Sequence, residues 1–321
     1  MKTIPNLPVV RLMPFSEIEE KRRILLITSM PAWNAVSSSL CCTKPISMLE
    51  VKEASTAHWD DLISKIGAQD LEIVYAVGGG LVADAAKYIA SRLDLGLRVL
   101  PTALSVDAFI TAASGIRREG CVYYLPTKVP EEIILDLEVI GRAPASLRAA
   151  GVTDVMSIAT GCWDWKFAGE QGMNPAGMEF VPWVYENAQS ILQGVLDCAE
   201  AAGRGDPAGL KTLYDCLSME VQLCNQVGHA RPEEGSEHYF AYSVENYLGH
   251  GLPHGDLVGP GILLMAGLQG QDTRRYEAAL RACNVPLERI PAEVTAQTLK
   301  GLPDYCAKHG LPFGIAHTLR G

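Results

Sequence analysis

The first 143 residues alternate between short apolar runs and longer stretches with apolar residues at helical spacing. The apolar runs predict buried strands at 24–28, 48–51, 73–77, 98–102 and 133–136. The stretches between them predict helices at 32–40, 58–66 and 81–92. A regular alternation of strand and helix predicts a parallel sheet wrapped by helices, an α/β domain of the Rossmann-like kind.

The pattern changes after Pro144. No convincing strand pattern follows it, and the remaining apolar spacing is helical throughout. The predicted helices are 145–168, 184–202, 207–227, 238–248, 257–268, 274–283, 291–299 and 302–309. The sequence therefore predicts two domains, an α/β domain over residues 1–143 and an all-helical domain over residues 144–321.

Composition narrows the class of protein. The 321 residues are 48% hydrophobic, enough for two cores, and the net charge of −10 argues against a nucleic-acid partner. The nine cysteines include no CxxC pair, which indicates neither a disulfide framework nor a zinc knuckle. No apolar run has the length of a membrane span, and the first 15 residues lack the apolar core of a signal peptide. A cytoplasmic location is expected.

Three consecutive glycines, Gly78, Gly79 and Gly80, join the predicted strand at 73–77 to the helix that follows. Glycine permits positive φ angles and lets backbone N–H groups approach a ligand closely. Because a helix N-terminus favours anions, a pyrophosphate is the natural occupant of this turn. The GxGxxG fingerprint is absent, so a tight connection without a ligand stays open. Asp84 and Lys87, three residues apart, predict a surface ion pair.

A second loop follows the predicted strand at 98–102 at the same end of the sheet. It presents two hydroxyls and a carboxylate, from Thr102, Ser105 and Asp107. Since ligands bind at the carboxyl ends of parallel strands, these groups are candidates for ligand contact. The alternative is an ordinary helix start with Ser105 or Asp107 as N-cap.

Two imidazoles and a carboxylate are candidates for a metal site in the helical domain. Asp154 lies near the start of an apolar helix, where a buried carboxylate is costly unless it is paired or metal-bound. His238 and His254 lie in two further helical segments, and three such ligands leave one position of a tetrahedral metal open. Each residue alone has an ordinary structural explanation. His250 is interpreted as a supporting or substrate group, because glycine and proline interrupt the segment between it and His254.

Several motifs in order resemble the superfamily of iron-containing alcohol dehydrogenases, glycerol dehydrogenases, glycerol-1-phosphate dehydrogenases and dehydroquinate synthases. The resemblance runs from about residue 24 to at least residue 268, and the glycerol-1-phosphate dehydrogenase branch is most similar. The motifs are Gly78-Gly79-Gly80 with Asp84 and Lys87, Pro101-Thr102 with Ser105 and Asp107, Ala150-Gly151 with Asp154, Asp164-Trp165, Arg231-Pro232, Gly235-Ser236-Glu237-His238, and His254-Gly255-Asp256.

This resemblance implies a function and a set of site residues. Asp154, His238 and His254 hold one divalent metal, most often zinc in this branch and iron or nickel in relatives. The residues implied to bind NAD or NADP are Gly78, Gly79, Gly80, Asp84, Thr102, Ser105 and Thr111. The candidate catalytic groups are Asp107, His250 and Tyr242. The metal polarises a substrate carbonyl while the nicotinamide supplies hydride.

The sequence departs from the family pattern at several positions. Tyr242 stands where the family commonly has a histidine, and Ala108-Phe109 replaces the usual glycine after Asp107. The acids Glu233 and Glu234 are unfavourable for a phosphate-bearing substrate.

The leading hypothesis is a metal-dependent NAD(P) oxidoreductase acting on a small polyol or polyol phosphate. The alternatives are a dehydroquinate synthase-like cyclase with retained NAD, and a noncatalytic member that binds nucleotide or metal. A homodimer is the default assembly.

Overall fold

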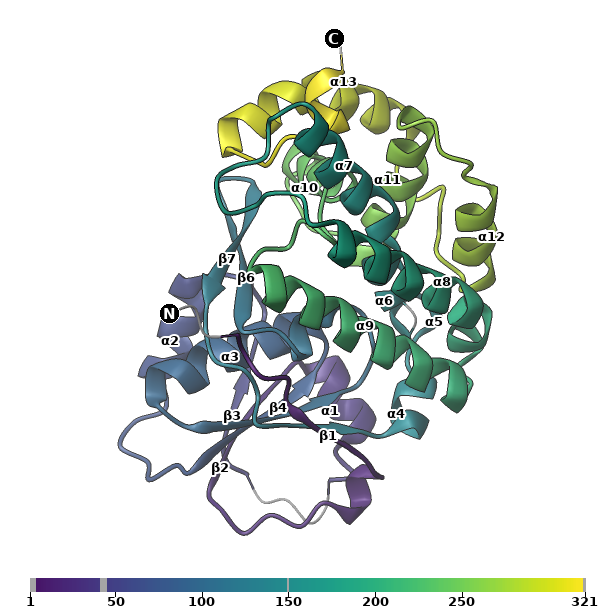
Figure 1. Ribbon diagram of the computed structural model, residues 1–321. Coiled ribbons are helices and arrows are strands. Elements are labelled where there is room, and N and C mark those ends of the chain that lie inside the picture. The colour runs from purple at the N-terminus through teal and green to yellow at the C-terminus, as the bar shows by residue number, and fades with distance from the viewer. Residues whose placement is uncertain (1–3, 41–44, 149, 320–321) are drawn as a thin grey trace. The chain divides into compact units, whose positions relative to one another are not determined.

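The computed structural model describes residues 4–40, 45–148 and 150–319 (Figure 1). The chain divides into two compact units, Met1–Ala143 and Pro144–Gly321. The first unit runs from purple to teal in Figure 1, and the second from teal through green to yellow. Each unit has its own architecture.

The first unit is built on a six-stranded sheet in the order β1-β8-β5-β4-β2-β3. All of its strand pairs are parallel. The strands are β1 (Val9–Leu12), β2 (Ile24–Thr28), β3 (Pro45–Glu50), β4 (Ile73–Gly78), β5 (Gly96–Pro101) and β8 (Glu132–Leu135). The helices are α1 (Met30–Val36), α2 (Thr56–Ser64), α3 (Gly80–Leu93) and α4 (Leu137–Gly141). The prediction of a parallel α/β domain is confirmed.

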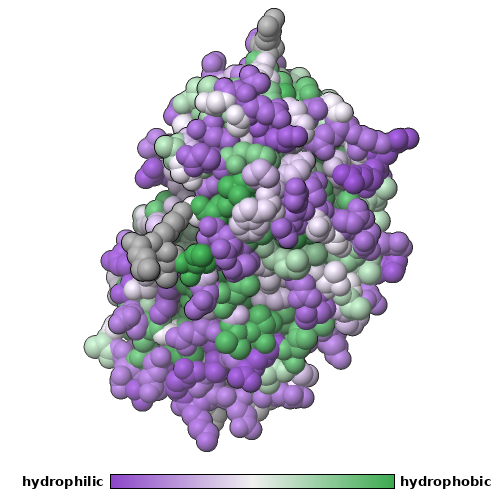
Figure 2. Space-filling model, viewed as in Figure 1, coloured by the Kyte–Doolittle hydropathy of each residue, from purple (hydrophilic) through white to green (hydrophobic). Residues whose placement is uncertain are grey.

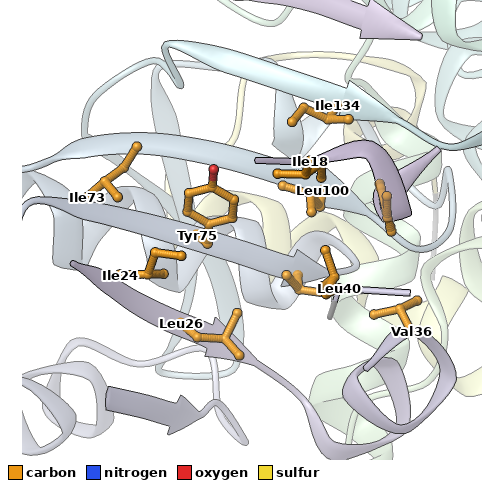
Figure 3. Packing of buried hydrophobic residues seen from close by; sticks show 11 residues of the cluster. Ile18, Ile24, Leu26, Val36, Leu40, Ile73, Tyr75, Leu100 and Ile134 are labelled. Atoms are coloured by element: carbon orange, nitrogen blue, oxygen red, sulfur yellow. The ribbon is translucent and has the colours of Figure 1, made fainter. Parts of the chain in front are cut away.

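The hydrophobic core of this unit follows the two-residue period of its strands. Ile24 and Leu26 of β2 lie on the same face as Ile73 and Tyr75 of β4, because alternate residues of a strand share a face. The cluster shown in Figure 3 is completed by Leu100, Ile134, Val36, Leu40, Ile18, Phe15 and Val77. The central position of β2 and β4 explains why both strands are buried along their whole length.

A charged network lies beside this core. The side chain of Glu20 is only 6% exposed. Its carboxylate oxygen Oε2 accepts hydrogen bonds from Tyr75 Oη at 2.8 Å and Arg98 Nη1 at 2.9 Å. The guanidinium of Arg22 binds the same carboxylate at 2.7 Å. Burial raises the pKa of Glu20, but its hydrogen bonds with Arg22 and Tyr75 outweigh that effect and lower the pKa to about 2.

The Glu20 network predicts acid sensitivity. The folded pKa lies below the unfolded value, so the stabilisation is present above the unfolded pKa and is lost as pH falls towards about 2. The full contribution is up to about 3 kcal/mol. We expect Glu20→Gln to lower the free energy of unfolding near pH 7, and the difference from wild type to shrink by more than half near pH 3. Urea denaturation at both pH values measures this, and a difference independent of pH contradicts the account.

Three strands of this unit were not predicted. All four residues of β1 are exposed at the sheet edge, so no buried apolar run marks this strand. The other two, β6 (Ala113–Arg118) and β7 (Cys121–Pro126), form a separate antiparallel hairpin. Its turn residues Glu119 and Gly120 have φ of 54° and 76°, as a two-residue turn between twisted strands requires.

The second unit contains helices and no strand among its described residues. They are α5 (Ala145–Arg148), α6 (Gly151–Met156), α7 (Ile158–Glu170), α8 (Pro182–Arg204), α9 (Pro207–Val227), α10 (Ser236–Leu248), α11 (His254–Leu268), α12 (Arg274–Ala282) and α13 (Ala292–His309). The prediction of an all-helical C-terminal region is confirmed. None of the helices in the described ranges is both long and apolar enough to cross a membrane.

Two helix predictions in this unit were wrong. The single helix expected at 145–168 is three helices, and the hydroxyl of Ser157, between α6 and α7, binds the carbonyl oxygens of Asp154 and Glu233. The two helices expected at 291–299 and 302–309 are one, which continues through Pro303. Burial of Leu302 and Cys306 on its inner face outweighs the helix-breaking tendency of proline.

The surface is mixed in character. Figure 2 shows hydrophilic residues over much of the face in view, with apolar residues between them. The most exposed large apolar side chains of the two units include Val9 of β1, Tyr247 of α10 and Met219 of α9. Scattered apolar side chains of this kind are ordinary on a protein surface.

Candidate metal centre and cofactor turn

Three side chains in the second unit converge at the starts of three helices. Asp154 comes from α6, His238 from the first turn of α10, and His254 is the first residue of α11. Asp154 Oδ1 lies 2.9 Å from His254 Nε2 and 3.9 Å from His238 Nε2. The ligand atoms of all three residues lie within 4.8 Å of one another. Two imidazoles and a carboxylate placed so closely form a candidate metal centre.

The donor set fits a tetrahedral cation. Ligand bonds of about 2.1 Å place the donors of a tetrahedral ion roughly 3.4 Å apart, which lies between the 2.9 Å and 3.9 Å that separate Asp154 Oδ1 from the two imidazole nitrogens. The side chains of His238 and Asp154 are only 6% and 13% exposed, whereas that of His254 is 26% exposed. The centre is therefore closed by protein around His238 and more open beside His254, as a catalytic site with a free coordination position requires.

The start of α10, which carries His238, is held by a buried carboxylate of α7. Asp164 Oδ2 accepts hydrogen bonds from the backbone N–H of Ser236 at 2.8 Å and from the hydroxyl of Ser236. Its Oδ1 accepts from Ile315 N at 2.8 Å and from Gln269 Nε2 at 3.1 Å. Burial raises the pKa of Asp164 to about 6, although the donors from Ser236 lower it. One carboxyl group thus joins four segments around the candidate centre.

Replacing Asp164 tests this arrangement. In Asp164→Asn a single acceptor oxygen remains, so two of the four donors face an amide nitrogen and lose their partner. We expect a loss of about 2–4 kcal/mol in the free energy of unfolding, measured by urea denaturation. The control is Asp215→Asn, which breaks only the exposed i,i+4 pair with Lys211 and is expected to cost less than about 0.5 kcal/mol. Equal effects of the two substitutions would refute the role of Asp164.

A second buried carboxylate, not assigned a role from the sequence, lies directly behind His238. Glu237 Oε1 is 2.9 Å from His238 Nδ1. Burial lowers the pKa of His238, but the hydrogen bond to Glu237 and the charges of Glu237, Glu234 and Asp154 raise it to about 9. The only sequence signal for this contact was the position of Glu237 immediately before a candidate ligand.

Two candidate catalytic residues, Tyr242 and His250, also belong to the second unit, and their surroundings differ from each other. Tyr242, one turn after His238, is buried with its ring centre 6.0 Å from that of His238, and its hydroxyl donates to Glu234 Oε1 at 3.1 Å. His250 is exposed in the loop between α10 and α11, with Nδ1 3.2 Å from the carbonyl oxygen of Gly251. The structure therefore brings Tyr242 beside a predicted metal ligand and leaves His250 at the surface.

The glycine turn of the first unit lies between β4 and α3. None of Gly78, Gly79 and Gly80 has a positive φ, so the left-handed backbone that glycine permits is not used in this turn. Glycine is needed at two of these positions because a neighbouring side chain lies too close for a Cβ atom. A Cβ on Gly78 would lie 2.7 Å from Val82 Cγ2, and one on Gly80 would lie 2.6 Å from a side-chain carbon of Val106. Apart from its neighbours in the chain, the one described atom within 4 Å of a Cβ added to Gly79 is Ser105 Oγ, at 3.6 Å, which leaves space before the N-terminus of α3.

The Asp84–Lys87 pair is buried, contrary to the expected surface pair. The Lys87 side chain is 0% exposed, with Nζ 3.1 Å from Asp84 Oδ1. Lys87 also donates to Thr111 Oγ1 at 2.9 Å and to the carbonyl oxygen of Ala113. Burial raises the pKa of Asp84, and the charge of Lys87 acts in the opposite direction. Asp84 and Thr111 therefore hold a lysine that joins α3 to the start of β6.

The loop after β5 lies against the glycine turn. Thr102 N donates to the carbonyl oxygen of Gly78 at 3.1 Å. Asp107 begins a short 3₁₀ helix, Asp107–Phe109, whose N-cap is Val106 and has no side-chain capping bond. The alternative in which Ser105 or Asp107 caps a helix is therefore wrong. Ser105 is instead the residue nearest to the open side of Gly79.

Comparisons with known proteins agree with this architecture. The family model described as iron-containing alcohol dehydrogenase matches residues 11–144. Glycerol-1-phosphate dehydrogenase [NAD(P)+] of Sulfolobus acidocaldarius is 30% identical over 251 residues, 78% of this chain and 67% of that protein. The same enzyme of Sulfurisphaera tokodaii is 29% identical over 275 residues, 86% of this chain and 75% of that protein.

The fold is also found in solved structures. Glycerol dehydrogenase from Schizosaccharomyces pombe superimposes with a TM-score of 0.71 at 19% identity, covering 98% of this chain and 85% of that chain. The chain belongs to the iron-containing alcohol dehydrogenase family and is an oxidoreductase. The resemblance identified from the sequence motifs is confirmed.

Proposed function

We propose that this protein is a metal-dependent NAD(P) oxidoreductase acting on a small polyol or polyol phosphate, as the glycerol-1-phosphate dehydrogenases do by name. The observation that carries the proposal is the convergence of Asp154, His238 and His254 within 4.8 Å. A bound divalent cation and a nicotinamide cofactor supply, respectively, a Lewis acid for the substrate oxygen and the hydride. Imidazole and carboxylate donors suit zinc, which we propose as the metal, and also iron and nickel.

The cofactor is proposed to bind in the first unit. The space beside Gly79, at the N-terminus of the fourteen-residue helix α3, suits a pyrophosphate because free N–H groups and the helix dipole favour an anion. Ser105, whose hydroxyl lies near Gly79, supplies a side-chain donor, and Thr102 holds the neighbouring loop in place. Asp107 is proposed to contact substrate and nicotinamide.

Two groups in the second unit are proposed to handle the proton. The Tyr242 hydroxyl is held by Glu234 one helical turn from His238, so it keeps a proton close to the proposed metal ligands. The single hydroxyl hydrogen is held by Glu234, so Tyr242 donates to the substrate oxygen by exchanging that partner for the substrate. His250 is exposed, and it is proposed to connect the site with solvent.

A substrate panel tests the function. Protein loaded with Zn²⁺ is mixed with NADH or NADPH and with dihydroxyacetone, dihydroxyacetone phosphate or glyceraldehyde, and nucleotide oxidation is followed by absorbance. We expect oxidation with at least one of these carbonyl compounds, and loss of the activity when the metal is removed by a chelator. Protein that binds metal and nucleotide but oxidises no NAD(P)H with any of them contradicts the proposal and favours the cyclase or the noncatalytic alternative.

The homodimer and the cytoplasmic location stay predictions from the sequence. Size-exclusion chromatography with light scattering measures the assembly directly, and localisation of a tagged protein measures the compartment.

A further inference from the structure

Glu237 is the most deeply buried charged side chain beside the candidate metal centre. Its side chain is 0% exposed. Oε1 accepts a hydrogen bond from the backbone N–H of Gly235 at 2.7 Å and lies 2.9 Å from His238 Nδ1. Oε2 is also buried and has no hydrogen-bond partner in the described part of the chain. A buried carboxylate with one unpartnered oxygen is costly, which calls for a compensating role.

The carboxylate of Glu237 is paired with one imidazole among the described residues. That partner is His238, and no lysine or arginine lies within ion-pair distance of Glu237 in the same residues. A buried negative charge needs a nearby positive charge to be tolerated. A metal cation bound to Nε2, the other ring nitrogen of His238, would supply this positive charge.

The two nitrogens of His238 point at two different carboxylates. Nδ1 faces Glu237 at 2.9 Å, and Nε2 faces Asp154 Oδ1 at 3.9 Å. A carboxylate on one ring nitrogen keeps the proton of a neutral imidazole on that nitrogen. The lone pair of Nε2 is then directed towards Asp154 and His254, where the proposed cation is held.

We propose that Glu237 is a positioning residue that raises the affinity of the centre for a divalent cation. It fixes the orientation and tautomer of His238 and makes the ring a stronger donor. Asp154 and Glu237 together bring two negative charges, which balance one divalent cation held by two neutral imidazoles. This inference rests on the proposed metal site and adds to it the residue that tunes its affinity.

The variant Glu237→Gln removes the negative charge of this side chain and keeps nearly its size and shape. The amide oxygen of glutamine can still accept from Gly235 N and His238 Nδ1, while the negative charge is lost. The control is Glu277→Gln on α12, an exposed carboxylate paired with Arg281. The dissociation constants of Zn²⁺ and Co²⁺ are measured for the full chain by competition with a chromophoric chelator, together with the absorption spectrum of bound Co²⁺.

We expect Glu237→Gln to weaken Zn²⁺ and Co²⁺ binding by roughly 10–100-fold and to shift the visible spectrum of bound Co²⁺. Glu277→Gln should leave both unchanged. Melting of the metal-free proteins separates this role from a purely structural one. Because the amide oxygen of glutamine can keep the hydrogen bond to Gly235 N, metal-free Glu237→Gln should still fold and unfold cooperatively, while its stabilisation by Zn²⁺ shrinks.

The results distinguish this inference from the proposed function. Binding of Zn²⁺ by Glu237→Gln within about threefold of wild type overturns the inference alone, since an affinity effect of the expected size is 10-fold or more. A variant that does not fold without metal makes Glu237 a structural group and also overturns it. If wild-type protein binds no metal, or binds it equally well after Asp154→Asn, the metal site itself fails and the inference fails with it.

Discussion

Asp154→Asn is expected to remove the bound metal and to lower kcat/KM by roughly 10³-fold or more, because the metal supplies several kcal/mol of transition-state stabilisation. Asp154 is the anionic member of the three converging ligands and is positioned between both histidines. The neutral amide oxygen of asparagine is a weaker ligand of nearly the same size, so the fold should be retained. Metal content of the purified protein and NAD(P)H oxidation measure the two effects.

The control for this substitution is Asp197→Asn on α8. Asp197 is exposed and accepts a hydrogen bond from Gln193 one turn earlier on the same helix. We expect this variant to keep full metal content and activity. Asp154→Asn protein with wild-type metal content would show that the cation is held elsewhere.

Gly79→Ala is expected to weaken NAD(P)H binding by about 10–100-fold while leaving the fold intact, a loss of roughly 1.4–2.8 kcal/mol. The φ of Gly79 is −93°, an angle that alanine adopts without strain, and the nearest described atom to an added Cβ, leaving out the neighbours in the chain, is 3.6 Å away. The methyl group would instead occupy the space in which the pyrophosphate is proposed to approach the backbone. Nucleotide fluorescence titration and thermal melting measure binding and stability.

Gly78→Ala supplies the contrast. Its Cβ would lie 2.7 Å from Val82 Cγ2, inside the contact between β4 and α3, so we expect this variant to lose stability. If Gly79→Ala binds NADH and NADPH as tightly as wild type, the nucleotide does not contact this turn.

The sequence predicted strands best where every residue of the strand is buried. The strand at 24–28 was predicted with its observed bounds, because β2 lies inside the sheet and every residue of it is apolar or fully buried. A buried apolar run could not reveal strand β1, because β1 lies at the edge of the sheet and all four of its residues are exposed. The β6–β7 hairpin was missed because its burial pattern is irregular.

Residue types and motifs identified the candidate metal ligands, but they did not show that these ligands lie close together in space. Asp154 and His254 are 100 residues apart, and only tertiary packing brings Oδ1 and Nε2 to 2.9 Å. The supporting carboxylates were harder still. Asp164 and Glu237 gain their importance from hydrogen bonds to backbone and imidazole groups, which no periodicity in the sequence encodes. The reason for the glycine triplet was likewise steric contact with Val82 and Val106, not backbone angle.

Anomalous X-ray scattering from a crystal of the Zn²⁺-loaded protein, recorded at the zinc absorption edge, shows whether Asp154, His238 and His254 hold the metal. We expect a single strong peak about 2.0–2.2 Å from Asp154 Oδ1, His238 Nε2 and His254 Nε2. A zinc peak bound by other residues, or a catalytically active crystal with no metal between these three side chains, would contradict this expectation.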